Sequence, residues 1–167
     1  MNVWAVRPER EGDETGIAWV ITSAFAAAGH SQGNEAEIVR RLRAGRELEA
    51  SYVAATPAGE IVGHVAFSPV RVDGDECGWY GLGPLAVLPE WRRRGIGAAL
   101  VDAGLERLRR IDAAGCVVLG EPAYYARFGF ATDPELRYPG PPPEYFQRLS
   151  LDGVAPGGLV EYSPAFA

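Results

Sequence analysis

The fold is decided by residues 85–110, LAVLPEWRRRGIGAALVDAGLERLRR. An apolar run ends at Pro89, three arginines follow, and Gly95 and Gly97 begin a segment whose apolar residues recur at helical spacing. The pattern predicts a strand, a glycine-containing loop and a long amphipathic helix with a basic last turn. Such a helix start presents unpaired backbone N–H groups at the positive end of the helix dipole. We therefore expect a phosphate site here, and the predicted ligand is a pyrophosphate.

Glycine and arginine contribute differently to the expected phosphate site. Gly95 and Gly97 carry no side chain, so a ligand can approach the backbone closely. Positive charge comes from three consecutive residues, Arg92, Arg93 and Arg94. A dinucleotide-binding fingerprint fits less well, because Leu100 stands where a third glycine or alanine is required. A plain helix start whose arginines form a solvated face is the other reading of this segment.

The flanking segments indicate a mixed α/β sheet. Gly81, Gly83 and Pro84 interrupt a strand-like run and predict a break in its pairing. The expected order is a strand at residues 3–8, helices within 9–29 and 35–45, strands at 51–56, 60–72 and 77–88, a helix at 95–111, a strand at 116–120, a short helix at 121–129, and strands at 130–132 and 159–162. From residue 138 to the last of these strands we expect a stiff proline-rich loop.

Length and composition limit the classes of protein. The 167 residues suffice for one domain, residues 1–167, and 47% hydrophobic with 23% charged residues is typical of a globular chain. A net charge of −6 argues against broad nucleic-acid binding. No apolar run approaches the roughly 18 residues of a membrane span, and the first residues do not resemble a signal peptide. We therefore expect a cytoplasmic protein with no membrane or nucleic-acid partner.

The placement of the cysteines and the absence of lysine argue against several further kinds of site. Cys77 and Cys116 lie far apart in the sequence with no nearby thiol or histidine, so neither a metal site nor a disulfide framework is predicted. All 16 basic residues are arginine. The lack of lysine excludes the phosphate loop that ends in Lys-Ser/Thr and any Schiff-base lysine.

Two motifs at matching spacing resemble signatures of the GNAT superfamily of N-acetyltransferases. Arg92-x-x-Gly95-x-Gly97 resembles its pyrophosphate-binding motif, and YYARFGF, residues 124–130, is similar to its later Tyr-x-Arg/Lys-x-Gly-Phe motif. From VRPER at residue 6 to VEYSPAF at residue 160, the chain resembles the bacterial YhbS-like branch. The resemblance implies a GNAT acyltransferase fold, in which a central, mostly antiparallel sheet splays between its fourth and fifth strands and carries helices on both faces.

The resemblance also implies a reaction. Acetyl-CoA would serve as cosubstrate without a metal, and a primary amine of a small molecule or peptide would attack the thioester directly. The segment from Leu85 to Val87 matches the strand that binds pantetheine in the family. The residues that it implies for cofactor binding are Leu85, Ala86, Val87, Arg92, Arg93, Arg94, Gly95, Ile96, Gly97, Ala98 and Tyr125.

Catalysis of such a transfer needs an oxyanion donor and an acid for the leaving thiolate. The backbone N–H of Ala86, or of Val87 beside it, is the expected donor. Tyr125 aligns with the family's general acid, and a phenol with a pKa near 10 is protonated at neutral pH. The other reading is that Tyr125 only packs against the pantetheine arm. Tyr124 is expected to point elsewhere, into the core.

No motif identifies the general base. Glu121 ends its strand near the expected sheet centre and is a candidate, although its place in a helix first turn already explains it. His30 and Glu35 fall in a segment that borders the acceptor pocket in the family, and Tyr80 lies on the splayed strand. His64, inside an alternating strand, is expected to be structural.

Two other functions stay open. A CoA-binding sensor or accessory domain without turnover would explain why the splayed strand has no carboxylate after Glu76. A transferase of a longer acyl group would carry the same motifs. The sequence identifies neither the amine acceptor nor the oligomeric state, which could be a monomer or a homodimer.

Overall fold

The computed structural model describes residues 3–26, 28–29 and 31–167. Its strands are β1 (Ala5–Pro8), β2 (Ala50–Ala55), β3 (Ile61–Val72), β4 (Asp75–Val87), β5 (Gly115–Leu119), β6 (Leu136–Arg137), β7 (Phe146–Ser150) and β8 (Gly158–Glu161). Its α-helices are α1 (Glu14–Phe25), α2 (Glu35–Ala44), α3 (Ile96–Arg110) and α4 (Pro122–Tyr125). Single 3-10 turns are η1 (Pro89–Trp91), η2 (Ala126–Phe128), η3 (Pro143–Tyr145) and η4 (Pro164–Phe166).

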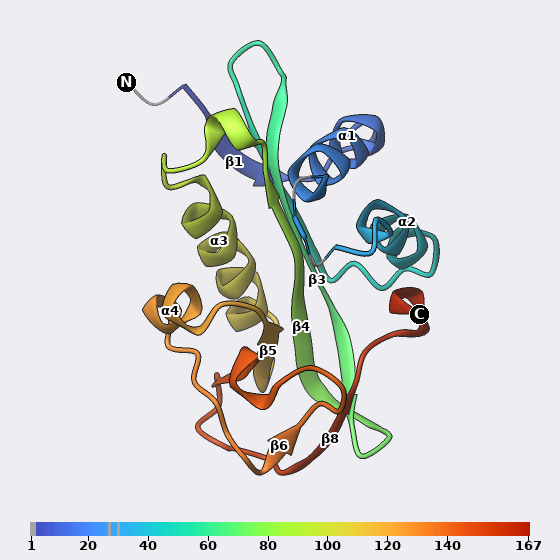
Figure 1. Ribbon diagram of the computed structural model, residues 1–167, viewed down its shortest axis with the longest axis vertical. Coiled ribbons are helices and arrows are strands. Elements are labelled where there is room, and N and C mark those ends of the chain that lie inside the picture. Colours follow the sequence, from blue (N-terminus) through green and yellow to red (C-terminus); the bar gives the residue numbers. More distant parts are fainter. Residues whose placement is uncertain (1–2, 27, 30) are drawn as a thin grey trace.

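One sheet carries the fold. Its strands follow the order β1-β2-β3-β4-β5-β7, and neighbours run antiparallel except β4 and β5, which are parallel. Helices α1 and α2 lie on one side of the sheet and α3 on the other (Figure 1). The predicted mixed, mostly antiparallel sheet with helices on both faces is therefore confirmed.

Alternation along β3 explains how the two helical layers pack. A Cβ atom built on Gly63 would lie 2.8 Å from the Ile96 side chain, so Gly63 faces α3 and lets this helix approach. Since successive residues of a strand point to opposite faces, His64 faces α1 and α2. The Phe67 ring, on the α3 face, packs directly on Gly104 of that helix. The larger core cluster then joins both helical layers to the sheet.

The sheet splits between β4 and β5, as predicted. These strands pair only from Trp79 to Leu82 in β4 and from Gly115 to Val118 in β5. The cis peptide between Gly83 and Pro84 follows directly. Beyond it, residues 85–87 keep their pairing with β3. Strand β4 thus pairs with a strand on both edges before the cis peptide, and with β3 alone after it.

The C-terminal third differs most from expectation. The strand β7 was not predicted, because FQRLS is short and follows a proline-rich segment. It nevertheless pairs with the whole of β5. The strand predicted at 130–132 is reduced to one bridge between Ala131 and Arg148, and the short β6 pairs instead with β8. The predicted helix at 121–129 is a single turn, α4, followed by η2.

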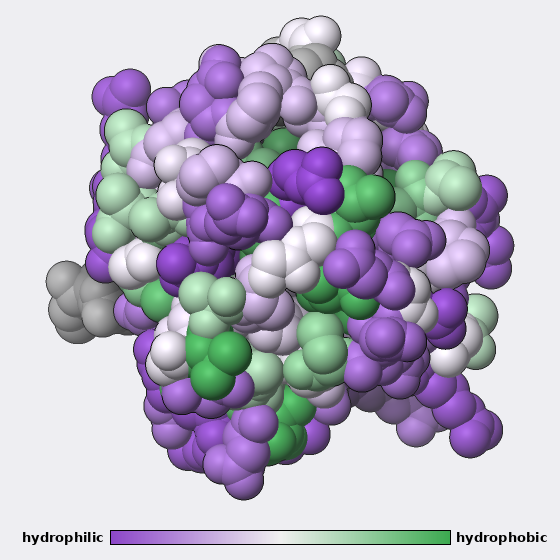
Figure 2. Space-filling view, turned by 90° about the horizontal axis from the view of Figure 1, so that it is seen from below, coloured by the Kyte–Doolittle hydropathy of each residue, from purple (hydrophilic) through white to green (hydrophobic). Residues whose placement is uncertain are grey.

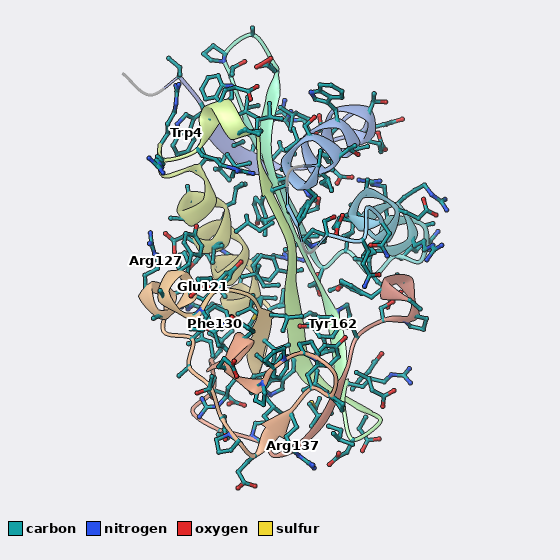
Figure 3. All side chains as sticks on the ribbon, viewed as in Figure 1. Trp4, Glu121, Arg127, Phe130, Arg137 and Tyr162 are labelled. Carbon is teal, nitrogen blue, oxygen red and sulfur yellow. The ribbon has the colours of Figure 1, made fainter. Side chains whose placement is uncertain are left out.

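The C-terminal residues complete the α1–α2 face of the sheet. Strand β8 pairs with the last residues of β3, Arg71 and Val72. The ring of Tyr162 then lies over Gly81 of β4, where a Cβ atom would be 2.7 Å from a ring carbon (Figure 3). At the end of the molecule near β6, hydrophilic residues predominate and hydrophobic ones form small separate groups (Figure 2). None of the helices in the described ranges is long and apolar enough to span a membrane.

Candidate functional site

The split in the sheet leaves backbone groups of β4 without a strand partner. Leu88 N–H donates to the Val62 carbonyl at 2.9 Å, which makes this a hydrogen-bonded pair of the antiparallel ladder. Hydrogen-bonded pairs alternate along such a ladder, so His64 and Ala86 form the next one. The N–H groups of Leu85 and Val87 therefore point away from β3, toward the split.

This alternation changes the expected oxyanion donor. The N–H of Ala86 is directed at His64 in β3, so it is engaged in the ladder. The N–H of Val87, the neighbour that we also considered, is directed toward the split. The geometry thus favours Leu85 or Val87 over Ala86 as a backbone donor to a ligand.

The N-terminus of α3 faces the same space. Gly95 precedes the helix with φ of +81°, in the left-handed region that favours glycine. Gly95, the N-cap residue, has no side chain that could cap this 15-residue helix, so its first N–H groups are available to a ligand. A Cβ atom on Gly97 would lie 2.7 Å from the Tyr124 hydroxyl, so a side chain there would collide with that phenol.

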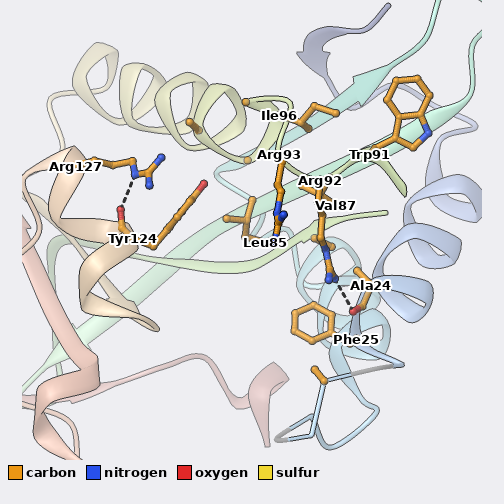
Figure 4. Close-up of a pocket in the computed structure, with 15 residues that line it drawn as sticks. Ala24, Phe25, Leu85, Val87, Trp91, Arg92, Arg93, Ile96, Tyr124 and Arg127 are labelled. Carbon is orange, nitrogen blue, oxygen red and sulfur yellow. Dashed lines mark hydrogen bonds between the residues drawn. The ribbon is translucent and has the colours of Figure 1, made fainter. Parts of the chain in front are cut away.

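The three consecutive arginines have separate roles. Arg92 and Arg93 line the cavity, and Arg92 donates to the Ala24 carbonyl at 3.2 Å, which connects it to the end of α1 (Figure 4). Arg94 turns away, with its guanidinium 4.5 Å from the centre of the Trp91 ring. Two of the three expected guanidinium groups therefore face the site.

These elements enclose a cavity of about 550 Å³ (Figure 4). This volume is within the usual range of ligand pockets. Its walls come from the end of α1, the half of β4 beyond the split, the loop before α3, the start of α3, and α4 with η2. The lining residues are Ala24, Phe25, Ala28, Leu85, Ala86, Val87, Trp91, Arg92, Arg93, Gly95, Ile96, Gly97, Ala98, Tyr124 and Arg127.

Of the two tyrosines of the YYARFGF segment, Tyr124 was expected in the core and Tyr125 at the pantetheine arm. Tyr124 lines the cavity, with the Arg127 guanidinium 4.5 Å from its ring centre. Tyr125 is only 9% exposed and packs edge-on against Phe130, with ring centres 5.9 Å apart. Burial raises the pKa of Tyr125, so its phenol stays protonated at neutral pH.

Tyr125 nevertheless marks the point where the split begins. A ring carbon of Tyr125 lies 2.5 Å from the place that a Cβ atom on Gly120 would occupy. Gly120 directly follows β5. The phenol ring thus sits at the end of the strand that separates from β4, while Tyr124 lies beside the α3 start.

The remaining candidates that the structure describes do not line the cavity. Glu121 is exposed and precedes α4 (Figure 3), and the Ser31 hydroxyl lies 2.8 and 2.9 Å from the Glu35 carboxylate oxygens. Tyr80 is half-buried in the paired half of β4, and burial raises its pKa. His30 lies outside the described residues. Among the described residues no cluster of three His, Cys, Asp or Glu side chains could hold a metal ion.

Several lining residues carried no sequence signal. Ala24, Phe25 and Ala28 reach the cavity because α1 packs across β3 and β4, and Trp91 ends the η1 turn directly before the arginines. Arg127 lay inside the recognised motif without an assigned role. Its side chain donates to the Tyr124 carbonyl at 3.0 Å (Figure 4), which could be found only from the folded turn.

Comparison with known proteins connects this geometry to one family. A model described as the acetyltransferase (GNAT) family matches residues 17–130. The uncharacterized N-acetyltransferase YhbS of Escherichia coli K12 is 37% identical, and the match covers 96% of this chain and 97% of YhbS.

Solved structures agree. A GNAT family acetyltransferase from Brucella melitensis in complex with acetyl-CoA has a TM-score of 0.88 and 43% identity, covering 98% of each chain. The Escherichia coli YhbS structure in complex with CoA has a TM-score of 0.85 and 36% identity, covering 99% of this chain and 93% of that one. An acetyltransferase of the same family from Staphylococcus aureus, at 14% identity and a TM-score of 0.64, shares the fold.

Proposed function

The chain belongs to the GNAT family of acetyltransferases, and from this premise we propose that it transfers the acetyl group of acetyl-CoA to a primary amine of a small molecule or peptide. The observation that carries the proposal is the shared space between the split in the sheet and the uncapped start of α3. Both present backbone N–H groups to one cavity of about 550 Å³. Relatives of 36% and 43% identity bind CoA and acetyl-CoA, which supports this cosubstrate.

The phosphate end of the cosubstrate is proposed to lie at the α3 start. N–H groups at a helix N-terminus and flanking guanidinium groups are the usual partners of a pyrophosphate. The proposed phosphate residues are therefore Arg92, Arg93 and the segment 95–98, all of which line the cavity. Arg94 is left out, because its guanidinium stacks on Trp91.

The pantetheine arm is proposed to lie along the half of β4 beyond the split. Its amides would pair with Leu85 and Val87, whose N–H groups are directed away from β3. The thioester would then reach the start of the split, beside Tyr125. An N–H of this strand half would bind the oxyanion, and Tyr125 would donate a proton to the leaving thiolate.

The amine must also lose a proton during the transfer. Glu121 is exposed, directly follows Gly120 and is proposed as the base.

Residues 1–167 are proposed to act as one domain, because the larger core cluster combines residues of α1, α3 and the central strands.

Turnover and cofactor binding test the proposal. Purified protein with acetyl-CoA and a panel of primary amines should release CoA thiol, and calorimetry should detect CoA binding. The double variant Arg92→Ala, Arg93→Ala should weaken CoA binding by about 10- to 100-fold, because two charge-assisted hydrogen bonds are lost. Arg94→Ala is the matched control and should bind within about twofold of wild type.

The outcomes separate the alternatives. CoA binding without thiol release for any amine would favour the sensor or accessory domain. Faster release from a longer acyl-CoA would favour that substrate over acetyl-CoA. If the double arginine variant bound CoA as tightly as wild type, the phosphate assignment would be wrong.

A further inference from the structure

His64 is a buried titratable group on β3, the strand that pairs with the half of β4 beyond the split. Its side chain is 0% exposed and lies on the α1–α2 face of the sheet. It pairs across the ladder with Ala86, which lines the cavity. Side chains of paired residues share a face, with Cβ atoms about 4.5–5.5 Å apart. The His64 side chain therefore lies beside that of Ala86, on the strand half whose backbone N–H is proposed to bind the oxyanion.

Hydrogen bonds on one side of the ring define its tautomer. The Ser51 hydroxyl donates to a Glu9 carboxylate oxygen at 2.6 Å, and a hydroxyl has only one proton to donate. Its oxygen also lies 2.9 Å from His64 Nε2. Ser51 must therefore accept from Nε2–H, which leaves Nδ1 with a lone pair.

The Glu9 end of this chain is held ionised. Burial alone would raise the pKa of Glu9, but hydrogen bonds from Arg43 and Ser51 bring it below its ordinary value. The Arg43 guanidinium binds both carboxylate oxygens, at 2.8 and 3.0 Å. An ionised carboxylate can only accept, so the direction of each bond from His64 to Glu9 is determined.

The other ring nitrogen is unused. His64 Nδ1 is buried and has no hydrogen-bond partner among the described residues. Buried polar atoms of native proteins are rarely left unpaired. A bare imidazole nitrogen accepts from N–H or O–H donors. An amine is a donor of this kind.

We propose that His64 positions the nucleophile, with Nδ1 accepting a hydrogen bond from one water molecule whose oxygen in turn accepts from an N–H of the incoming amine. Ser51 and Glu9 are positioning residues that hold the tautomer. The inference rests on the proposed function, since it assigns the orientation of the amine in that reaction.

The charge of the ring fits positioning better than proton abstraction. Burial lowers the pKa of His64 to about 4, with Glu9 and Asp13 raising it and Arg43 lowering it. The imidazole is therefore neutral at neutral pH and keeps its lone pair. No limb of the pH–rate profile near the ordinary histidine pKa of about 6.5 should belong to His64.

Nitrogen NMR tests the tautomer without any assumption about activity. The sequence has two histidines, so histidine-labelled protein gives two imidazoles, and His30→Asn assigns them. We expect the Nε2–H form of His64 at pH 7. In Glu9→Gln the new amide can donate to Ser51, whose proton then turns to Nε2, so the Nδ1–H form should appear. An Nδ1–H form or an imidazolium in wild-type protein would overturn the proposal.

Two amide substitutions separate positioning from structure. His64→Gln can keep a donor near Nε2 and loses the Nδ1 acceptor, whereas His64→Asn places an amide near Nδ1 and loses the Ser51 bond. Turnover with the best amine of the panel should fall by about tenfold or more in His64→Gln and by less in His64→Asn. CoA affinity should stay within about twofold in both. Thermal stability should be higher in His64→Gln than in His64→Asn, because only His64→Gln can keep the bond to Ser51. Equal turnover in wild type and His64→Gln would refute the positioning role of His64.

Further variants cover the remaining outcomes. Thr56→Ala, which removes a hydroxyl in the turn between β2 and β3, is the control and should keep wild-type turnover. If His64→Gln fails to fold, Ser51→Ala carries the test, because it leaves the imidazole in place and frees its tautomer. It should give mixed tautomers and slower turnover, and wild-type values for both would overturn the proposal. Absence of turnover in wild-type protein would instead refute the proposed function, and the tautomer measurement would stand alone.

Discussion

The two halves of β4 show how one strand can serve as both core and ligand surface. From Tyr80 to Leu82 it pairs with β3 on one edge and with β5 on the other. From Leu85 to Val87 it pairs with β3 alone, and one edge faces the cavity. The difference lies in the partner strand, since β5 separates from β4 after Val118 while it stays paired with β7. Backbone groups become available to a ligand where a neighbour departs, without any special side chain.

The largest expected effect tests alternation within the open half. Ala86→Pro should lower the free energy of unfolding by about 3 kcal/mol, because it removes an N–H directed at β3. Val87→Pro should retain most of the stability and weaken CoA binding by about tenfold, because its N–H faces the split. Urea denaturation and calorimetry measure the two quantities. Equal stability of the two variants would contradict the register argument.

A smaller effect distinguishes the two tyrosines beside these halves. Tyr125→Phe should lower kcat by about 10- to 100-fold with CoA affinity unchanged, because the phenol at the end of β5 is the proposed acid. Tyr124→Phe should change CoA affinity more than kcat, because that hydroxyl lies beside Gly97 at the α3 start. Steady-state kinetics with calorimetry compares them. A kcat loss confined to Tyr124→Phe would transfer the acid role to that residue.

The smallest expected effect concerns Glu9, which binds Ser51 next to His64. The folded protein holds the pKa of Glu9 below its ordinary value, so the ionised form stabilises the fold above about pH 4.5. This contribution should decline as the pH falls through the folded pKa. Urea denaturation between about pH 3 and 7 should show a weaker pH dependence in Glu9→Gln. The same slope in both proteins would exclude Glu9 as a contributor.

Local sequence patterns predicted the elements around the split well. The glycines and proline of β4 indicated the broken pairing, and the apolar stripe from Ile96 indicated α3. Each signal depends on neighbours in the chain, such as a residue that cannot donate or a helical repeat. The resemblance to the GNAT superfamily then supplied the topology, which local patterns do not contain.

The missed features depend on contacts between distant residues. Strand β7 forms because the edge of β5 is available for pairing, and the residues FQRLS contain no local signal of that partner. Tyr124 lines the cavity and the Tyr125 ring lies against Gly120, a difference that depends on how α4 packs after β5. His64 was expected to be structural, and its unpaired nitrogen became visible only with Ser51 in place.

The closing of the sheet by β8 and Tyr162 has a consequence for biosynthesis. The N-terminal part of a chain leaves the ribosome first, whereas a domain folds as a unit. Here residues 158–166 pair with β3, cover Gly81 and contact α2, so the face that they complete stays open until they emerge. Nascent chains arrested before residue 158 should therefore be more sensitive to protease than the 167-residue chain carried clear of the ribosome by an added C-terminal linker.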